Sequence, residues 1–358
     1  RLALEGLPWE YGDAAEMQRL SAKYAGADQG KVTRVFGANF IGRMSGKVVE
    51  AFVAKADLLA ASPAYSDQSG VDWKTAAASA AKVLNHIGGV DGMDPTGWTW
   101  YCNVDDIEKL SPTESPAEIL WRGERAKSLS LEEDNFPPTL YGNGRINPTQ
   151  NLVDAFPMLN GYPVSHLSGE YDENLPYANR DPRLEAYILY NGCKAGNTNK
   201  EIFTAADGTT NDALNKVVGR STRTGYYLRK LLRQDISLDP NAKADQYHYT
   251  PRIRYTEIFL AYAEAANQAY GPQDKGGNGY SAYDVVKKLR HRAGIGRDNG
   301  DAYLESIKND QAKMAELIRN ERRIELCFEG FRFWDLRRWK SNLTETAKGM
   351  NISGTRYT

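Results

Sequence analysis

The feature that most constrains the fold is a pair of neighbouring segments that both have the pattern of a helix. In residues 43–61 the apolar side chains recur at spacings of four, four and three residues, at Val48, Phe52, Ala56 and Leu59. This period places them on one face of an amphipathic helix, and the Ser-Pro step at residues 62–63 ends it. Residues 73–87 form a second, alanine-rich helical pattern. Small side chains let two helix backbones approach closely, so we predict a helical hairpin.

The same pattern returns near the carboxyl end of the sequence, in residues 253–270 and 281–294. A fixed offset of 207 residues aligns five pairs of similar side chains: Glu50 with Glu257, Phe52 with Phe259, Ala54 with Ala261, Ala56 with Ala263, and Trp73 with Tyr280. Such a match indicates two copies of one helix-turn-helix unit of tetratricopeptide type. A lone unit cannot bury its apolar face, so the units are expected to stack on each other or on further units.

The segment between the two copies, residues 88–252, has a different character. Pro, Gly, Asn and Asp interrupt short apolar runs such as EILWR and LEAYILY, and PTQNLVDAFPM predicts one short helix. Long irregular insertions in a compact chain usually carry binding or catalytic residues. We therefore expect a mainly α protein, with tetratricopeptide-like hairpins as a superhelical scaffold and a loop-rich lobe that contains short strands. The expected division is 1–87 as the end of an N-terminal helical part, 88–252 as the ligand-binding lobe and 253–358 as C-terminal helices.

Residues 319–339, RNERRIELCFEGFRFWDLRRW, combine ten charged side chains with eight large apolar ones. A helix over residues 310–329 would place Glu321, Glu325 and Glu329 in a row among arginines, and Gly330 would break or close it. Arginine pairs with carboxylates through two hydrogen bonds and lies over aromatic rings. Because acids and bases nearly balance, we interpret the segment as an internal ion-pair network of the scaffold. A catalytic group and an anion site are the alternatives.

Composition excludes several classes of protein. A formal net charge of -1 over 358 residues argues against a nucleic-acid binder, which needs a basic surface. No apolar run is long enough to span a bilayer. The cysteines and histidines lack the spacing of metal ligands, and no nucleotide-binding or zinc-protease motif is present, so we predict neither metal nor cofactor. Calcium at Asp91, Asp94 or near Asp172 would lack the usual loop pattern. Cys327 lies in an apolar stretch, which predicts a buried, inert thiol.

The candidate ligand-binding residues are aromatic and polar side chains of the central segment. The sequence has 21 Tyr and 7 Trp, and these rings combine a flat apolar face with a polar group. A sugar site needs such rings together with polar side chains that meet hydroxyls. Three loops have this combination, and their candidate residues are Tyr141 and Asn143; Tyr171, Asp172 and Tyr177; and Trp98 and Trp100. Ordinary packing is the alternative for each ring, above all for the two tryptophans, which follow a helical hairpin.

The segment RNERRIELCFEGFRFWDLRRW resembles, almost position for position, the C-terminal signature of the SusD/RagB family. Four further stretches are similar to that family in the expected order: GKVVEAFVAKADLLAASPAY (46–65), NPTQNLVDAFPMLNGYP (147–163), NRDPRLEAYILYNG (179–192) and RYTEIFLAYAEAANQAYG (254–271). The family consists of surface-exposed outer-membrane lipoproteins of Bacteroidota that capture nutrients. The resemblance covers most of residues 40–340.

This resemblance implies a non-enzymatic protein that captures oligosaccharides or polysaccharides on the extracellular face of the outer membrane. It implies a SusC-like TonB-dependent transporter as partner, over which the binding protein acts as a lid. Family members begin with a signal peptide and a lipid-modified cysteine, whereas this sequence opens on Arg1. We therefore expect a fragment or processed chain, with the lipid anchor and part of the ligand site outside it.

Three alternatives remain at the level of sequence. A RagB-like minority of the family implies a peptide-binding nutrient receptor. A helical glycoside hydrolase would need two carboxylates that flank a scissile bond, and no such pair is defined by the pattern. A pure tetratricopeptide scaffold would lack the long irregular insertion.

Overall fold

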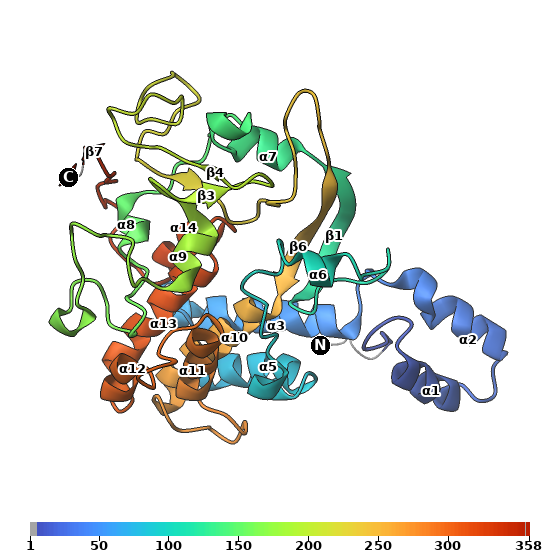
Figure 1. Ribbon diagram of the computed structural model, residues 1–358. Coiled ribbons are helices and arrows are strands. Elements are labelled where there is room, and N and C mark those ends of the chain that lie inside the picture. The colour runs from blue at the N-terminus through green and yellow to red at the C-terminus, as the bar shows by residue number, and fades with distance from the viewer. Residues whose placement is uncertain (1–5, 355) are drawn as a thin grey trace.

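The computed structural model describes residues 6–354 and 356–358, so Arg1 lies outside the described residues. In this part of the chain the protein is mostly helical, with 14 α-helices and few strands. Helices α3, α5 and α10–α13 gather in one layer, and a two-stranded ribbon connects them to a lobe of loops and short elements (Figure 1). The predicted fold class, a tetratricopeptide-like helical scaffold with an irregular lobe, is confirmed.

Five helices form the scaffold: α3 (Gly46–Ala61), α5 (Trp73–Asn85), α10 (Tyr255–Tyr270), α11 (Ala282–Arg292) and α13 (Gln311–Glu325). Side chains satisfy the free backbone N–H groups at three of their starts. Asp72 and Asp310 each accept a hydrogen bond from the backbone three residues ahead, and Ser281 forms a capping box with Asp284. Caps of this kind stabilise a helix by about 1 kcal/mol each. The Ser-Pro step ends α3 at Ala61, as predicted.

Small side chains bring these helices together. Ala54 of α3, Ala77 and Ala80 of α5 and Ala263 of α10 have no exposed surface, and all belong to one hydrophobic cluster that also includes residues of α11 and α13. Helix α5 contacts both α3 and α10, so the first hairpin stacks directly on the second. Segments about 200 residues apart in the chain therefore share a single core.

The predicted apolar face of α3 was partly wrong. Phe52 and Leu59 are 43% and 45% exposed, whereas Ala51 and Leu58 are buried. The contact with α5 and α10 runs along the alanine side of the helix, because small residues allow the closest approach of backbones. The larger side chains are left outside this contact. Phe52 instead meets the ring of Trp121 edge-on, with ring centroids 5.7 Å apart.

Two helices precede the scaffold, α1 (Ala14–Lys23) and α2 (Gln29–Phe36), and the carboxylates of Asp13 and Asp28 cap them. They extend to one side of the molecule in Figure 1. The segment before α1 joins the scaffold where the ring of Trp9 stacks on that of His86, at a centroid distance of 3.5 Å. The sequence pattern did not predict these helices individually, because their apolar faces are short.

A long antiparallel ribbon joins the scaffold to the lobe. Strand β1 (Ile119–Ser128) pairs with β6 (Gln246–Arg254), although more than 100 residues separate them in the chain. The register is regular from Arg125 opposite Tyr249 to Ser128 opposite Gln246, and it is interrupted by bulges closer to the scaffold. Most of the lobe, residues 129–245, is thus inserted between the two strands of one ribbon, which is why both ends of this segment return to the same place.

The lobe has two hydrophobic clusters of its own. Residue Phe156 lies in one and Phe136 in the other, and both are buried. Its helices are short: α6 (Val104–Ile107), α7 (Ser130–Asn135), α8 (Gln150–Val153) and α9 (Pro182–Tyr187). Its strands are β2 (Ile188–Leu189), β3 (Lys194–Ala195), β4 (Lys200–Glu201) and β5 (Tyr227–Leu228). The remaining elements are α4 (Ser66–Ser69), α12 (Ala302–Ile307), β7 (Ile352–Ser353) and β8 (Arg356–Tyr357).

Helix α13 ends at Glu325, four residues before the predicted end. Phe328 and Gly330 then adopt positive φ angles of 64° and 83°, and α14 (Phe331–Arg338) follows at once. The sequence pattern does not predict this helix. Because α13 ends early, the chain turns, and the carboxylate of Glu329 contacts Lys230 and Arg254. The predicted continuous helix did not include these contacts.

Candidate ligand-binding site

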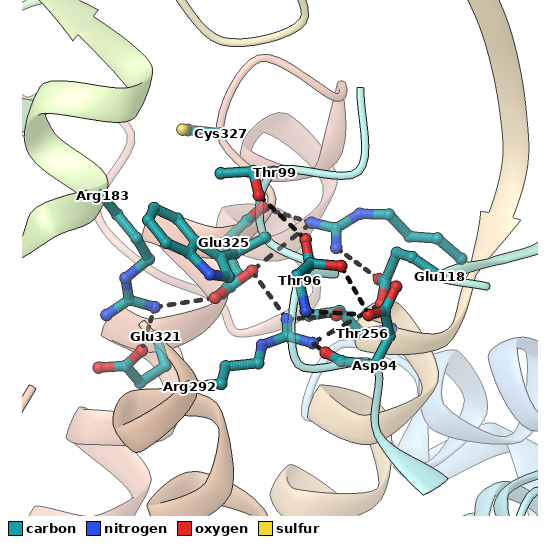
Figure 2. Close-up of polar contacts among 12 residues, drawn as sticks. Asp94, Thr96, Thr99, Glu118, Arg183, Thr256, Arg292, Glu321, Glu325 and Cys327 are labelled. Atoms are coloured by element: carbon teal, nitrogen blue, oxygen red, sulfur yellow. Dashed lines mark hydrogen bonds and ion pairs between the residues drawn. The ribbon is translucent and has the colours of Figure 1, made fainter. Parts of the chain in front are cut away.

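A buried network of ion pairs lies where the lobe meets the scaffold (Figure 2). It contains five cations and six carboxylates, and each of these residues is buried or nearly so. Its members are Arg183, Lys230, Arg254, Arg290 and Arg292 with Glu118, Asp181, Asp301, Glu321, Glu325 and Glu329. They come from β6, α9, α11, α13 and the loops beside them, so the network joins both parts of the molecule.

Glu325 lies at the centre of this buried ion network. Figure 2 shows its carboxylate between Arg183 and Arg292, at 3.0 Å and 3.4 Å. Burial alone would raise the pKa of Glu325, but the surrounding cations outweigh it and lower the pKa to about 2. Arg292 also reaches the hydroxyl of Thr256 at 2.7 Å. The carboxylates in this network are paired and enclosed, which is the arrangement of a structural ion network.

A second group of charges attaches α14 to the scaffold. Arg338 donates two hydrogen bonds of 2.6 Å to Glu264 of α10, and the indole N–H of Trp339 donates to the same carboxylate at 2.7 Å. The interpretation of residues 319–339 as internal therefore agrees with these contacts, but not along its whole length. Phe333 and Trp334 are 53% and 64% exposed, because only one face of α14 meets the other helices.

Two arginines of residues 319–339 differ in their surroundings. Arg322 is buried and its Nε donates to Asp335 at 2.8 Å. Arg332 is half-buried, and burial lowers its pKa. Among the described residues no carboxylate lies within ion-pair distance of Arg332.

A cavity of about 560 Å³ lies against the ribbon, and we call it the ribbon cavity. Its walls include four aromatic rings, those of Trp100, Tyr101, Tyr249 and Phe331. Its polar lining comes from both strands and from α7, and includes Glu124, Ser128, Ser130, Asp134, His248, Thr250 and Arg252. Aromatic walls with a few convergent polar groups are the usual composition of a small-molecule site of this size.

The charged residues of the ribbon cavity are mostly paired. Arg254 bonds to Glu118 at 2.7 Å and to Glu329 at 2.8 Å, and Glu257 bonds to Lys55 at 2.8 Å. Burial raises the pKa of Glu257 although Lys55 partly opposes it, whereas the pKa of Glu329 is lowered because Arg254 and Lys230 outweigh its burial. Both carboxylates are thus held by cations.

Trp100 and Trp98, two of the predicted ligand residues, belong to the same hydrophobic cluster of the lobe. Trp100 is 4% exposed, lines the ribbon cavity and meets the ring of Tyr101 edge-on at 5.7 Å. Its Nε1–H is buried and has no hydrogen-bond partner among the described residues. Trp98 is half-buried in the same cluster, and its carbonyl oxygen accepts a hydrogen bond from Tyr187. Neither is a surface ring.

The second predicted group lies at another part of the lobe. Tyr177 is half-buried and stacks on Tyr190 at a centroid distance of 4.1 Å, in a cluster of four tyrosines with Tyr226 and Tyr357. The guanidinium of Arg180 lies 5.5 Å from the ring of Tyr171. Asp172 is exposed and accepts two hydrogen bonds from Asn174. Of this group, Tyr177 shares a hydrophobic cluster with the two tryptophans.

The third group lies in the loop after the short turn Pro138–Leu140. Tyr141 is 46% exposed with a positive φ of 66°, and the ammonium group of Lys200 lies 5.4 Å from its ring. The backbone of Asn143 donates to the carbonyl oxygen of Glu133, and its side chain is half-buried. Neither lines the ribbon cavity. The seven residues as a set of ligand contacts stay a prediction.

Sequence reasoning missed most of the ribbon cavity. Tyr249, Glu124 and Arg252 come from strands that were expected to be short and irregular. The alternation of tyrosine, histidine, threonine and isoleucine in residues 247–253 is typical of a strand, and this signal could have indicated the ribbon. The pairing of two strands so far apart in the chain could not be found from local pattern.

Within the described ranges, no three His, Cys, Asp or Glu side chains gather as metal ligands. In the same residues, no helix is long and apolar enough to cross a membrane. The three thiols are unpaired, and burial raises the pKa of Cys327 to about 11, as expected for an inert core cysteine.

Comparison with known proteins adds a family to this geometry. The sequence profile of the SusD family matches residues 121–357. Two curated proteins of Formosa agariphila are similar to parts of the chain. They are SusD-like protein P38, 33% identical over 85 residues, and SusD-like protein P2, 32% identical over 102 residues. These matches cover 24% and 28% of this chain and 16% and 18% of the two relatives.

Solved structures extend the likeness to nearly the whole fold. A SusD-like protein of Bacteroides fragilis is 25% identical with a TM-score of 0.64, and the match covers 92% of this chain and 62% of that protein. A SusD-like carbohydrate binding protein of the same species is 21% identical with a TM-score of 0.62, over 95% of this chain and 64% of that one. The chain thus spans less than two thirds of the length of these structures.

Proposed function

The chain belongs to the SusD family, and from this membership we propose that it is a non-enzymatic protein that captures oligosaccharides or polysaccharides. The observation that carries the proposal is the ribbon cavity, in which four aromatic rings face a lining of hydroxyl and other polar groups. A pyranose presents an apolar C–H face and a rim of hydroxyls, so it is matched by such a lining. A similar structure bears the name of a carbohydrate binding protein, which supports the same ligand class.

We further propose that the protein works on the extracellular face of the outer membrane beside a SusC-like TonB-dependent transporter. Its role is to hold the glycan weakly and to pass it to that transporter as a lid over the barrel. A lipid anchor at a position before the residues of this chain would keep it at the membrane. The stacked helices, with their shared core, would serve as a rigid support for the lobe during transfer.

The rival function is glycoside hydrolysis, which needs a proton donor and a second carboxylate across the scissile bond. Two carboxylates line the ribbon cavity with opposite pKa shifts, Glu257 and Glu329. Each is engaged by cations, Glu257 by Lys55 and Glu329 by Arg254 and Lys230. Removing them from these pairs would uncover buried charge, so a structural role fits them better than proton transfer.

Binding to a panel of glycans tests the proposal. We expect calorimetry and affinity gels to find at least one glycan with a dissociation constant in the micromolar to millimolar range, because few anchoring groups are desolvated. A reducing-sugar assay on the same glycan should show no release of new ends. Binding of peptides but of no glycan would assign the protein to a RagB-like role. Turnover that is abolished by Glu257→Gln would favour the hydrolase.

A further inference from the structure

The charged residues around the ribbon cavity define the chemistry of its ligand more closely than family membership does. We infer that this cavity is a binding site for an uncharged segment of a glycan and that it rejects uronate, sulfate and amino groups. The inference rests on the proposed function, because it specifies the ligand of a glycan-binding protein. It concerns the cavity between the ribbon, the scaffold and the start of the lobe, which only one of the residues predicted from sequence, Trp100, lines.

The charged groups deep in the cavity balance one another. Each buried ionic group there already has a partner of opposite sign within 3 Å: Arg254 has Glu118 and Glu329, and Glu257 has Lys55. A charged ligand group would have to break one of these pairs or enter without a counter-ion. Either event costs several kcal/mol in a buried site. A hydroxyl group has no such cost.

The charged residues at the rim of the cavity also balance one another. Asp134 lines the cavity with a side chain that is 45% exposed, and it pairs with Arg145 at 3.2 Å. Glu124 and Arg252 are also exposed, and among the described residues neither forms an ion pair. The guanidinium of Arg252 lies over the ring of Trp121 at 4.8 Å. One negative and one positive charge cancel, so the rim has no surplus that would select an anion or a cation.

The walls of the cavity also carry neutral polar groups. Ser128, Ser130 and Thr250 line the cavity with hydroxyl or backbone groups, and His248 is held by Glu132 at 3.0 Å. A hydroxyl group both donates and accepts hydrogen bonds, so the lining formed by Ser128, Ser130 and Thr250 is suited to the hydroxyl groups of a neutral sugar.

The volume of the cavity limits the size of the ligand. A volume of about 560 Å³ lies within the range of roughly 300–1,000 Å³ that encloses a small ligand. The cavity therefore fits a short stretch of sugar units rather than a long chain, and a polysaccharide would enter it by an end or a side branch.

A cavity-filling variant tests the location. Ala126 lines the cavity, whereas the next residue, Lys127, points to the other face of β1 because strand residues alternate. We expect Ala126→Trp to weaken binding of the best neutral glycan of the panel by about tenfold or more, as the loss of an enclosed ligand requires. The matched control Lys127→Trp should stay within about twofold of the wild type. Unchanged binding by a folded Ala126→Trp variant would overturn the inference.

A pair of rim variants tests the charge rule without altering the core. For a hexose glycan that binds, the second ligand is the same glycan oxidised at its C6 hydroxyl to a carboxylate. The wild type should bind this anionic form about tenfold more weakly or worse. Glu124→Gln should reduce the ratio of the two dissociation constants by about threefold to fivefold, because it leaves the positive charge of Arg252 unopposed. Arg252→Gln should increase this ratio by a similar factor, because it leaves the negative charge of Glu124 unopposed. Both residues are exposed, so both variants should fold.

The outcomes separate the two proposals. If the glycan affinity is unchanged by Ala126→Trp, the ribbon cavity is not the site, although the proposed function stands. The same holds if both rim variants change the affinity ratio of the neutral and anionic glycans in the same direction. Tighter binding of the carboxylate form than of the neutral form overturns the charge rule. Absence of binding to every glycan overturns the proposed function, and this inference with it.

Discussion

Single arginines show how this protein holds charge in its interior. Arg180 is buried, and its guanidinium donates to three backbone carbonyl oxygens at 2.6–2.8 Å. Burial lowers its pKa, although nearby tyrosines and carboxylates partly compensate. Arg183, three residues later, has no exposed surface and bonds to carboxylates instead. Burial alone would lower its pKa, but Asp181, Glu321 and Glu325 outweigh it and raise the pKa well above its usual value.

Removal of one member of the buried ion network should be far more damaging than removal of an exposed pair. We expect Arg183→Gln to reduce the free energy of unfolding by about 3–5 kcal/mol, because it leaves buried carboxylates without their cation. Urea denaturation followed by circular dichroism measures this change.

The matched control is Arg145→Gln. Arg145 is 64% exposed in its side chain and lies 3.2 Å from Asp134. Its loss should reduce the free energy of unfolding by less than about 1 kcal/mol. Similar losses for the two variants would contradict a structural role of the network.

At the scale of elements, α3 shows why helical period alone does not define a buried face. Its helix is correctly predicted, yet the side in contact with α5 and α10 is the alanine side, with Ala51, Ala54 and Leu58. Phe52 and Leu59 remain partly exposed. The width of an apolar face that turns inward depends on the neighbouring helix, and the closest neighbour here is itself rich in alanine.

Two adjacent leucines of α3 should therefore respond very differently to truncation. Leu58 is 6% exposed and Leu59 is 45% exposed. We expect Leu58→Ala to reduce the free energy of unfolding by about 2–4 kcal/mol, because it opens a cavity in the core. Leu59→Ala should cost less than about 1 kcal/mol. Denaturant titration of the two variants side by side decides whether the alanine side of α3 is the buried one, and the reverse order would show that it is not.

For the whole molecule, the buried ion network has the role that a hydrophobic interface often has. It joins the lobe, through Asp181 and Arg183 of the α9 region, to α11 and α13 of the scaffold. The strands of the ribbon return to the same point, where Arg254 meets Glu118 and Glu329. The surrounding cations lower the pKa of Glu325 and Glu329 in this network, so the stability of the whole fold should fall as the pH is lowered.

The pKa of Glu325 is about 2 in the folded protein and about 4.5 ordinarily. A carboxyl whose pKa is depressed by folding contributes stability above its unfolded pKa and loses it as the pH falls through the folded value. Glu325 should contribute about 3 kcal/mol at neutral pH, and this contribution should be lost between about pH 5 and pH 2. Urea midpoints measured at several pH values across this range should fall steadily.

Glu325→Gln provides the control for this pH dependence. The variant should be less stable at pH 7 and should lose less stability on acidification. Asp181 and Glu257, whose pKa values burial raises, act in the opposite direction within the same range. An equal acid slope in the wild type and the variant would show that Glu325 is not the group responsible.

The sequence by itself determined the parts of this protein that follow from local pattern. Helical period, alanine content and caps such as Asp72 and Ser281 define the hairpins of the scaffold. The balance of arginine and glutamate in residues 319–339 predicted internal ion pairs, and Arg322, Glu325 and Arg338 do form them. The motifs of that segment and of four others also identified the family.

Tertiary structure alone decided the ribbon, the ribbon cavity and the exposed face of α14. The ribbon pairs strands separated by most of the lobe, and no local pattern encodes which distant strand a given strand will meet. Trp100 was predicted as a ligand residue, but the other rings of the cavity include Tyr249 of β6 and Phe331 of α14, which come from distant parts of the chain. Phe333 and Trp334 looked internal by composition and are exposed because one helix face can meet only one neighbour. Period and composition are properties of a segment, whereas a cavity belongs to the surfaces that several segments bring together.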